Sequence, residues 1–291
     1  MSKIALVIND ILRFGGAERY LLEQAKYLKE KNFEVRIFTW DFNEKLYKFS
    51  EFKRDITVVE AGDVRLQLKV QSAVKQIGSW NPDLVIAHAQ PANIIAYKVF
   101  KKYKINYILN IHGTFINFEN DLLRYSNIFR DKFIKFMKTN DSLKEFAKYD
   151  INKGFSFKRK YQLEYWAKLD YKSFINSSVI VVLSEHVKKN VKYFYGVDSI
   201  IHHPGHLKKE SYVKPELDID FSKGLFIFIG RLDKRKRVSL ILDAVNLLPD
   251  NIRDGIQCLI IGEGEERLNL ENQVKDLGLG SEIKIIGNLS D

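Results

Sequence analysis

A cluster of cations follows an apolar run in the second half of the chain. Residues 225–229 are continuously apolar, Gly230 follows them, and Arg231 and Lys236 lie shortly beyond. Such a run is typical of a strand covered on both faces, and a glycine allows a tight turn at its carboxyl end. Anions bind at these strand ends, where Arg offers a bidentate fork and Lys a mobile point charge. The segment therefore predicts a phosphate site, with a solvated basic loop as the alternative.

Glycines and histidines at three other places could take part in the same chemistry. Gly15 and Gly16 stand at the start of an amphipathic helix, and the first amides of a helix favour anions. The loop 262–264, Gly-Glu-Gly, follows another apolar run, although a plain turn explains it almost as well. His88 and His112 each end an apolar run, where a histidine either meets a ligand or is satisfied inside the protein.

Metal and disulfide chemistry are disfavoured. Three histidines lie within residues 202–206, but a Pro-Gly turn separates them and no acidic or cysteine ligand is near. The single cysteine, Cys258, lies in an apolar run and is expected in the core. We therefore expect no metal and no internal disulfide.

Composition indicates a globular protein of two domains. The chain has 291 residues, of which 45% are hydrophobic and 29% charged. No apolar run approaches the roughly 18 residues that cross a bilayer, and the N-terminus begins a strand rather than a signal peptide. We expect a cytoplasmic protein. Peripheral attachment to the inner face of the membrane is a second possibility that is compatible with the first. The first 212 residues carry 36 Lys and Arg against 23 Asp and Glu, a surplus that suits nucleic acid, anionic lipid or a phosphorylated substrate.

Hydrophobic periodicity predicts alternating strands and helices, which indicate an α/β fold with mainly parallel sheets. Strands are expected at 3–8, 33–40, 56–60, 84–88, 107–111 and 178–183, with helices between them. After a boundary near residue 210, strands are expected at 225–229, 256–261 and 282–286, with helices at 236–248 and 265–277. This division gives an N-terminal domain, 1–210, and a partial doubly wound domain, 211–291, whose last strand would lack neighbours.

Residues 115–178 are expected to be a helical insertion in the first domain, with helix 161–176 leading back to the sheet. An apolar stripe with helical spacing has basic neighbours; it comprises Leu122, Tyr125, Phe129, Phe133 and Phe136, and the neighbours are Arg124, Arg130, Lys132, Lys135 and Lys138. The stripe either packs on the domain or lies on an anionic membrane surface.

Motifs in a fixed order resemble a known family. GGAER begins at Gly15, NPDLVIAHA at Asn81, HGT at His112, VVLSE at Val181 and HHPGH at His202. Further on, IGRLDKRKRVSLILDAV and LIIGEGEERLNLENQVKDLGLGSEIKIIGNLSD are similar to Gly-Arg-Leu, Lys and Gly-x-Gly segments. Together they resemble the retaining, nucleotide-sugar-dependent GT-B glycosyltransferases of family four, over nearly the whole chain except the insertion.

The resemblance implies two Rossmann-like domains that face each other across a catalytic cleft. The second domain would hold most of a nucleoside diphosphate sugar and the first most of the acceptor, without a cofactor or metal. Arg231 and Lys236 would neutralise the diphosphate and stabilise the leaving group. Gly262, Glu263 and Gly264 would lie on the nucleotide side.

The first domain would complete the cleft in this resemblance. The amides of Gly15 and Gly16 would meet the phosphates, and His112 would hydrogen-bond near the sugar. His88 and Thr114 would lie on the acceptor side.

Two departures from the family pattern lead to an alternative function. Arg237 stands where the family commonly has Gly, which either crowds the phosphate loop or adds a cation. The sequence also ends before the family's paired-glutamate motif, so a truncated enzyme is expected. The alternative is a catalytically incompetent module for membrane docking, acceptor binding or assembly with a partner subunit. Nucleic acid is disfavoured because no binding module is recognised, and a nicotinamide dehydrogenase because no complete Gly-x-Gly-x-x-Gly follows the first strand.

Overall fold

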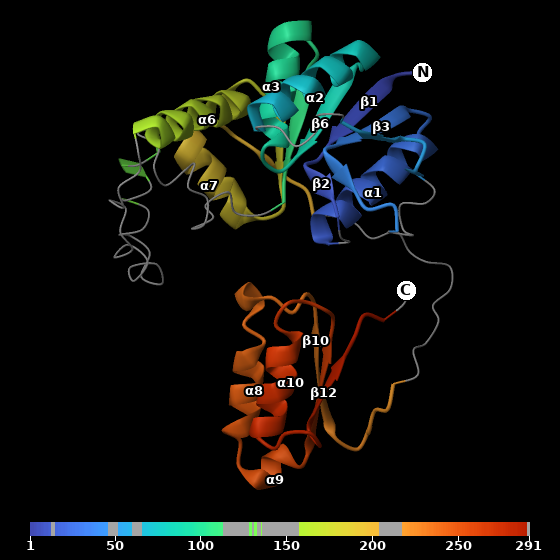
Figure 1. The fold of residues 1–291 in the computed structure, drawn as a ribbon, viewed down its shortest axis with the longest axis vertical. Coiled ribbons are helices and arrows are strands. Elements are labelled where there is room, and N and C mark those ends of the chain that lie inside the picture. Colours follow the sequence, from blue (N-terminus) through green and yellow to red (C-terminus); the bar gives the residue numbers. More distant parts are fainter. Residues whose placement is uncertain are drawn as a thin grey trace. The chain divides into compact units, whose positions relative to one another are not determined.

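The chain divides into two compact units. The computed structural model describes residues 1–12, 15–45, 52–59, 66–112, 128–129, 131–132, 135, 157–203 and 217–289. Unit 1 is Met1–Leu207 and unit 2 is Lys208–Asp291 (Figure 1), against an expected boundary between residues 210 and 211.

Unit 1 is built on a parallel seven-stranded sheet. Its strands are β1 (Lys3–Val7), β3 (Glu34–Thr39), β5 (Ile56–Val58), β6 (Leu84–His88), β7 (Tyr107–Ile111), β8 (Val179–Val182) and β9 (Ile200–Ile201). Their order is β5-β3-β1-β6-β7-β8-β9, and every neighbouring pair is parallel. The chain therefore builds outward from β1 in one direction and then, starting with β6, in the other. Ligands bind beyond the carboxyl ends of strands at such a switch point.

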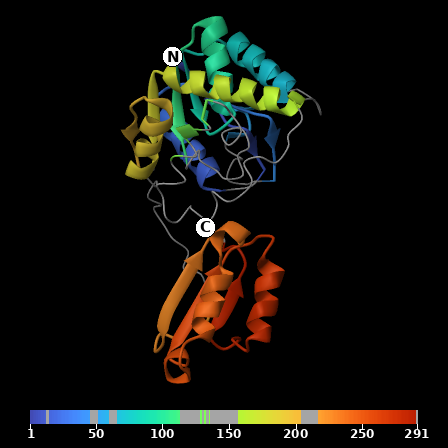
Figure 2. The ribbon, with the colours of Figure 1, turned by 90° about the vertical axis from the view of Figure 1, so that its left-hand side faces the viewer.

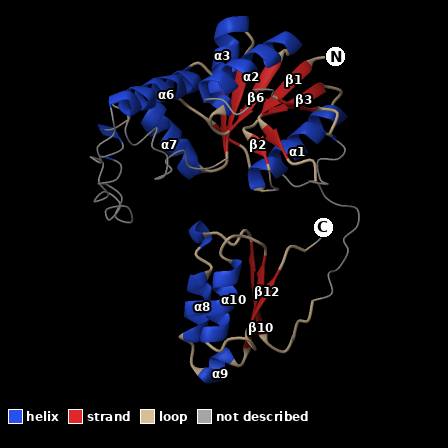
Figure 3. Ribbon diagram, in the orientation of Figure 1, coloured by secondary structure: helices blue, strands red, loops and turns tan. Residues whose placement is uncertain are grey.

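Helices cover both faces of this sheet. They are α1 (Gly16–Glu30), α2 (Leu66–Trp80), α3 (Ala92–Tyr103), α6 (Phe157–Ile175) and α7 (Glu185–Tyr195). Alternate residues of β1 point to opposite faces. Ile4 and Leu6 share an apolar cluster with Leu21 of α1, whereas Ala5 and Val7 belong to the cluster formed with α2, α3, α6 and α7. Figure 3 shows the strands between α1 and the pair α2 and α3, so the predicted α/β class is confirmed.

Two details of unit 1 differ from the prediction. Helix α6 begins at Phe157 rather than 161, and it packs against α3, as Figures 1 and 2 show. Strands β2 (Asp10–Ile11) and β4 (Asp41–Phe42) form a separate parallel pair. Two-residue strands are too short to show an alternating pattern, so local periodicity could not predict them.

Unit 2 contains a smaller parallel sheet. Its strands, β10 (Gly224–Ile229), β11 (Ile256–Ile261) and β12 (Ile283–Ile286), lie in the order β10-β11-β12. Helices α8 (Ser239–Asn246), α9 (Asp250–Arg253) and α10 (Arg267–Asp276) complete the described part. An apolar cluster joins α8 and α10 to one face of the sheet.

The predicted coverage of strand 225–229 on both faces was wrong. Every residue of β11 is buried, whereas most of β10 is exposed, including Ile227 at 51% and Ile229 at 75%. The reason is the strand order, because β11 has a neighbour on each side and β10 pairs only with β11 among the described strands.

The predicted helix 236–248 was also wrong at its start. A 3₁₀ turn, η4 (Lys234–Lys236), follows Asp233, and α8 begins only at Ser239. Arg237 separates the two because its backbone is left-handed, with φ of 50° and ψ of 41°. A left-handed residue cannot continue a right-handed helix, so the basic residues form a turn.

Candidate functional site

Asp233 holds together the basic turn beyond β10, which comprises residues 231–237. Its Oδ1 accepts a hydrogen bond from the Lys236 amide at 3.2 Å, which caps η4. Its Oδ2 lies 3.3 Å from Arg235 Nη2 and 3.8 Å from Arg231 Nη2. Burial opposes ionisation of this carboxyl, but the hydrogen bond from Arg235, the Lys236 amide and the two arginine charges lower its pKa overall. A carboxylate thus holds the predicted phosphate ligands Arg231 and Lys236 in one turn.

The loops beyond β10 and β11 are joined through their backbones. Gly230 N donates to Ile261 O at 3.0 Å, and Leu232 N donates to Glu263 O at 2.9 Å. This approach requires glycine: a Cβ on Gly262, where φ is +146°, would lie 1.9 Å from Gly230 O. The sequence pattern therefore reflects close contact between two loops.

Gly264 makes the second close approach. A Cβ there would lie 2.2 Å from Leu232 O, and Glu266 N donates to the same carbonyl at 3.0 Å. Glu263 forms an ion pair with Arg267, whose Nε also lies 2.7 Å from Glu271 Oε1. The structure thus brings the predicted residues of loop 262–264 beside those of the basic turn, and it shows the Glu263 carboxylate already paired.

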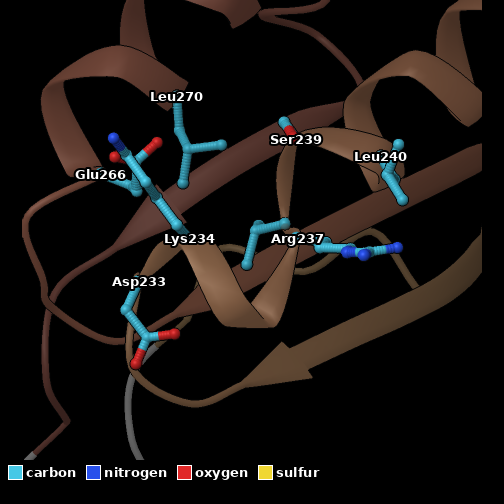
Figure 4. Close-up of a pocket in the computed structure, with 8 residues that line it drawn as sticks. Asp233, Lys234, Arg237, Ser239, Leu240, Glu266 and Leu270 are labelled. Atoms are coloured by element: carbon cyan, nitrogen blue, oxygen red, sulfur yellow. The ribbon is translucent and has the colours of Figure 1, made fainter. Parts of the chain in front are cut away.

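A cavity of about 380 Å³ borders the basic turn. Its lining joins the turn to the first residues of α8 and α10 and consists of Asp233, Lys234, Arg237, Val238, Ser239, Leu240, Glu266 and Leu270. In Figure 4 the side chains of Lys234 and Arg237 leave the turn in different directions. Arg231 and Lys236 are not among the lining residues, so the cavity is adjacent to the predicted phosphate ligands rather than formed by them.

The glycine motif of unit 1 lies at the N-terminus of α1. Gly15 is the N-cap of α1, and its amide donates to Glu18 Oε2 at 3.1 Å. A carboxylate in the first turn suits the positive end of a helix, and here it is paired with the Gly15 amide. The contact of that amide with a phosphate stays a prediction. Gly16 begins the helix, and a Cβ there would meet nothing within 4 Å.

A hydrogen-bonded pair of histidines lies at the carboxyl edge of the sheet. His88 Nδ1 is 2.8 Å from His112 Nε2, and His88 Nε2 is 3.0 Å from Gln24 Oε1 on α1. His88 has no exposed surface, whereas His112 is half-buried. The side chain of His88 therefore reaches the carboxyl edge only through His112, and its place on the acceptor side stays a prediction.

Burial keeps both histidines uncharged at neutral pH. It lowers the pKa of His112 to about 4. It lowers the pKa of His88 further below the usual range, with a smaller contribution from repulsion by His112. Neutral imidazoles donate one hydrogen bond and accept another, so the pair is suited to orienting a polar ligand rather than carrying charge.

Tyr20 of α1 contacts His112 and His202 at the same edge. The Tyr20 ring meets the His112 ring edge-on, with centroids 5.1 Å apart. The Tyr20 hydroxyl lies 3.4 Å from His202 Nδ1, just beyond β9. Neither Tyr20 nor Gln24 was predicted; their spacing of four residues on the face of α1 towards the sheet is the signal that could have indicated them.

A buried carboxylate of α6 stabilises the residues next to this edge. Asp170 of α6 has no exposed surface and accepts hydrogen bonds from Gln90, Asn93 and Tyr195. Desolvation raises its pKa, although all three donors act in the opposite direction. The Gln90 carbonyl also accepts from Asn9 Nδ2 at 2.6 Å, which links α6 to the loop beyond β1.

The predicted apolar stripe falls almost entirely outside the described residues, as does Thr114. Phe129 of the stripe is fully buried and packs against Phe194 and Tyr195. Lys132 donates to Phe194 O at 2.9 Å, at the carboxyl end of α7. For these two residues the structure favours packing on the domain over a membrane surface.

The described ranges contain neither a candidate membrane span nor a candidate metal cluster. None of the described helices has both the length and the hydropathy that crossing a bilayer requires. No group of three or more His, Cys, Asp or Glu side chains that could hold a metal occurs in the described part of the chain.

Solved structures show the same fold. Sucrose-phosphate synthase from Thermosynechococcus elongatus is similar at a TM-score of 0.69 and 14% identity, over 100% of this chain and 71% of that one. WaaG, a glycosyltransferase involved in lipopolysaccharide biosynthesis, gives 0.64 and 14%, over 99% and 70%. Anabaena HepE in complex with UDP and glucose gives 0.62 and 14%, over 100% and 70%. The parallel α/β units are thus those of the GT-B class.

The sequence comparisons identify the family. Residues 14–205 match Glycosyltransferase Family 4, and the chain therefore belongs to that family. Residues 212–291 match Glycosyl transferases group 1. A curated relative from Campylobacter jejuni, GalNAc-α-(1→4)-GalNAc-α-(1→3)-diNAcBac-PP-undecaprenol α-1,4-N-acetyl-D-galactosaminyltransferase, is 25% identical over 285 residues. That match covers 96% of this chain, which spans 66% of the relative's length.

Proposed function

We propose that this chain carries the machinery of a retaining glycosyltransferase, which moves a sugar from a nucleoside diphosphate to a glycan or lipid-linked acceptor. The observation that carries the proposal is the basic turn, where Asp233 holds Arg231 and Lys236 at the carboxyl end of β10. Membership of glycosyltransferase family 4 and the relative named for a lipid-linked substrate support the same chemistry.

In the proposed reaction, the bond between the sugar and the diphosphate oxygen breaks and a bond to an acceptor oxygen forms. The acceptor hydroxyl gives up its proton to water, and the nucleoside diphosphate leaves with additional negative charge. Arg231 and Lys236 stabilise that charge; before the reaction Asp233 holds the Arg231 guanidinium by an ion pair and the Lys236 backbone through its amide. His112 orients the sugar through a hydrogen bond, while loop 262–264 lies on the nucleotide side.

Nucleotide binding to the 291-residue chain tests the donor assignment. We expect calorimetric titration to show weak binding of UDP or GDP, and Arg231→Ala and Lys236→Ala each to weaken it by roughly 10-fold, because each removes a charge-assisted contact with phosphate. Lys275→Ala is the matched control, since Lys275 is an exposed cation in the last turn of α10. Failure of both nucleotides to bind, or equal binding by all variants, would contradict the assignment.

The stereochemical part needs its own measurement. The preferred nucleotide identifies which UDP- or GDP-linked sugars to supply with a lipid-linked glycan acceptor. The anomeric proton coupling in the NMR spectrum of the product then reports configuration. Retention gives the anomer of the donor, and the opposite anomer would overturn the retaining mechanism while leaving the donor site intact.

A further inference from the structure

The histidine pair contains a directional hydrogen-bond chain. We propose that Gln24 and His88 are positioning residues that fix the tautomer of His112, so that His112 Nδ1 presents a lone pair to one hydroxyl group of a sugar ligand. The ligand class rests on the proposed function, whereas the tautomer rests on the geometry of unit 1 alone.

Gln24 sets the direction of the chain. Its Oε1 lies 3.0 Å from His88 Nε2 and 3.3 Å from Asn110 Nδ2. Asn110 is a buried residue of β7 whose amide nitrogen can only donate. The atom that accepts this hydrogen bond is therefore the amide oxygen of Gln24, and an amide oxygen can only accept from His88 as well. His88 therefore carries its proton on Nε2.

The proton on His88 Nε2 determines the state of His112. A neutral imidazole has one N–H, so His88 Nδ1 is an acceptor. His112 Nε2, which lies 2.8 Å from His88 Nδ1, must then be the donor. The planes of the two rings differ by 16°. His112 is neutral too, since burial lowers its pKa to about 4. Its proton is thus used towards His88, which leaves Nδ1 unprotonated.

His112 is the end of the chain that can meet a ligand. His88 is completely buried, but His112 is half-buried at the carboxyl edge of the sheet. Tyr20 packs edge-on against the His112 ring and restrains its plane. Within the described residues Nδ1 has no hydrogen-bond partner. An acceptor at this place selects a hydroxyl donor, whereas the opposite tautomer would present an N–H.

Nitrogen NMR of histidine-labelled protein at pH 7.5 tests the tautomer directly. Long-range proton–nitrogen correlations distinguish protonated from unprotonated ring nitrogens. We expect Nε2–H tautomers for both His88 and His112. In Gln24→Leu the His88 proton loses its acceptor, so both rings should show mixed tautomers. In Gln24→Glu an oxygen remains, and the Nε2–H tautomers should be restored.

Gln76→Leu provides the matched control. Gln76 lies on α2 and donates to Ser72 Oγ at 3.1 Å, so the substitution removes a similar amide from another helix. Its histidine spectrum should equal that of the original protein. A proton on Nδ1 of His112 in the original protein, or an unchanged spectrum in Gln24→Leu, would overturn the proposal.

Activity separates this inference from the proposed function. If sugar transfer is detected, Gln24→Leu should lower kcat/KM by roughly 10-fold, the usual effect of one misdirected hydrogen bond, and Gln24→Glu should recover most of it. Fixed tautomers without any sugar transfer would preserve the hydrogen-bond chain and reject the function. Transfer that is unaffected by scrambled tautomers would reject the role of the lone pair.

Discussion

The ionisation of individual histidines at the sheet edge makes the stability of unit 1 depend on pH. His88 and His112 are held neutral by burial, and their protonation would place charge in a poorly solvated pair. An unfolded chain would protonate the same groups near their ordinary pKa of about 6.5. Below that pH the unfolded state binds more protons than the folded state, so the free energy of unfolding falls.

We therefore predict that unit 1 loses stability as pH falls from 7.5 to 5, with full stability above about pH 6.5. His112 alone should contribute a loss of about 2 kcal/mol over this interval. Trp40, Trp80 and Trp166 are the chain's three tryptophans and all lie in unit 1. Urea unfolding followed by tryptophan fluorescence therefore measures this unit specifically.

The variant His112→Gln can still donate to His88 but cannot titrate, so its unfolding free energy should fall less steeply with acid. His203→Gln, a change at an exposed histidine, is the control and should retain the original slope. An identical pH slope in His112→Gln would show that His112 is not the group responsible.

Residue types at strand ends could be read from the sequence, but their partners could not. His88 and His112 were each predicted to lie at the end of an apolar strand. Their hydrogen bond joins residues 24 positions apart, and the contact of His88 with Gln24 joins residues 64 positions apart, so both depend on packing between distant segments. Asp170 was not predicted at all, because its bond to Gln90 joins residues 80 positions apart and has no local pattern.

Among the elements, the turn between β10 and α8 departs most from its sequence pattern. Residues 236–248 have helical spacing, and the left-handed Arg237 interrupts them. Most strands were predicted within two residues because continuous apolar runs specify them. The turn could not be predicted in the same way, since local propensity places Arg in a helix and the Asp233 cap acts against it.

Replacing Arg237 by Gly should stabilise unit 2 by about 1 kcal/mol. Gly adopts a φ of 50° without the steric cost that a Cβ imposes, which outweighs its greater freedom in the unfolded chain. Hydrogen exchange of peptides from β10 to β12, measured by mass spectrometry, reports the stability of this unit.

Lys234→Gly is the control for that substitution. It removes one cation from the same turn, but Lys234 is in the right-handed part of η4. It should leave stability unchanged or lower it. Slower exchange in Lys234→Gly than in Arg237→Gly would contradict the backbone explanation. A gain for Arg237→Gly would also mean that the sequence retains a cation beside the cavity at some cost in stability.

At the scale of the whole molecule, unit 2 presents an open sheet edge. On β10, Phe226, Ile227 and Ile229 are more than half exposed, and the outer side of this strand has no pairing partner among the described residues. An exposed apolar edge is a template for pairing with another strand.

The 291-residue chain should therefore self-associate through β10 as its concentration rises. Sedimentation velocity between about 5 and 200 μM should show larger species. Ile227→Lys should suppress them by placing a charge on the edge. Leu268→Lys changes an exposed leucine of α10, 67% accessible, and should have no such effect. A chain that remains monomeric throughout, or equal suppression by both variants, would count against pairing at β10.

The link from Asp170 through Gln90 to Asn9 has a consequence for engineering. Asp170 lies in α6, which begins directly after residues 113–156. Through Gln90, Asp170 connects α6 to Asn9 in the loop beyond β1. Residues 113–156 can then be treated as an exchangeable cassette, with its boundaries at the end of β7 and the start of α6. A chimaera that preserves Asp170, Asn93 and Tyr195, and that keeps within the cassette the buried Phe129 packed against Tyr195, would inherit the loop geometry beyond β1.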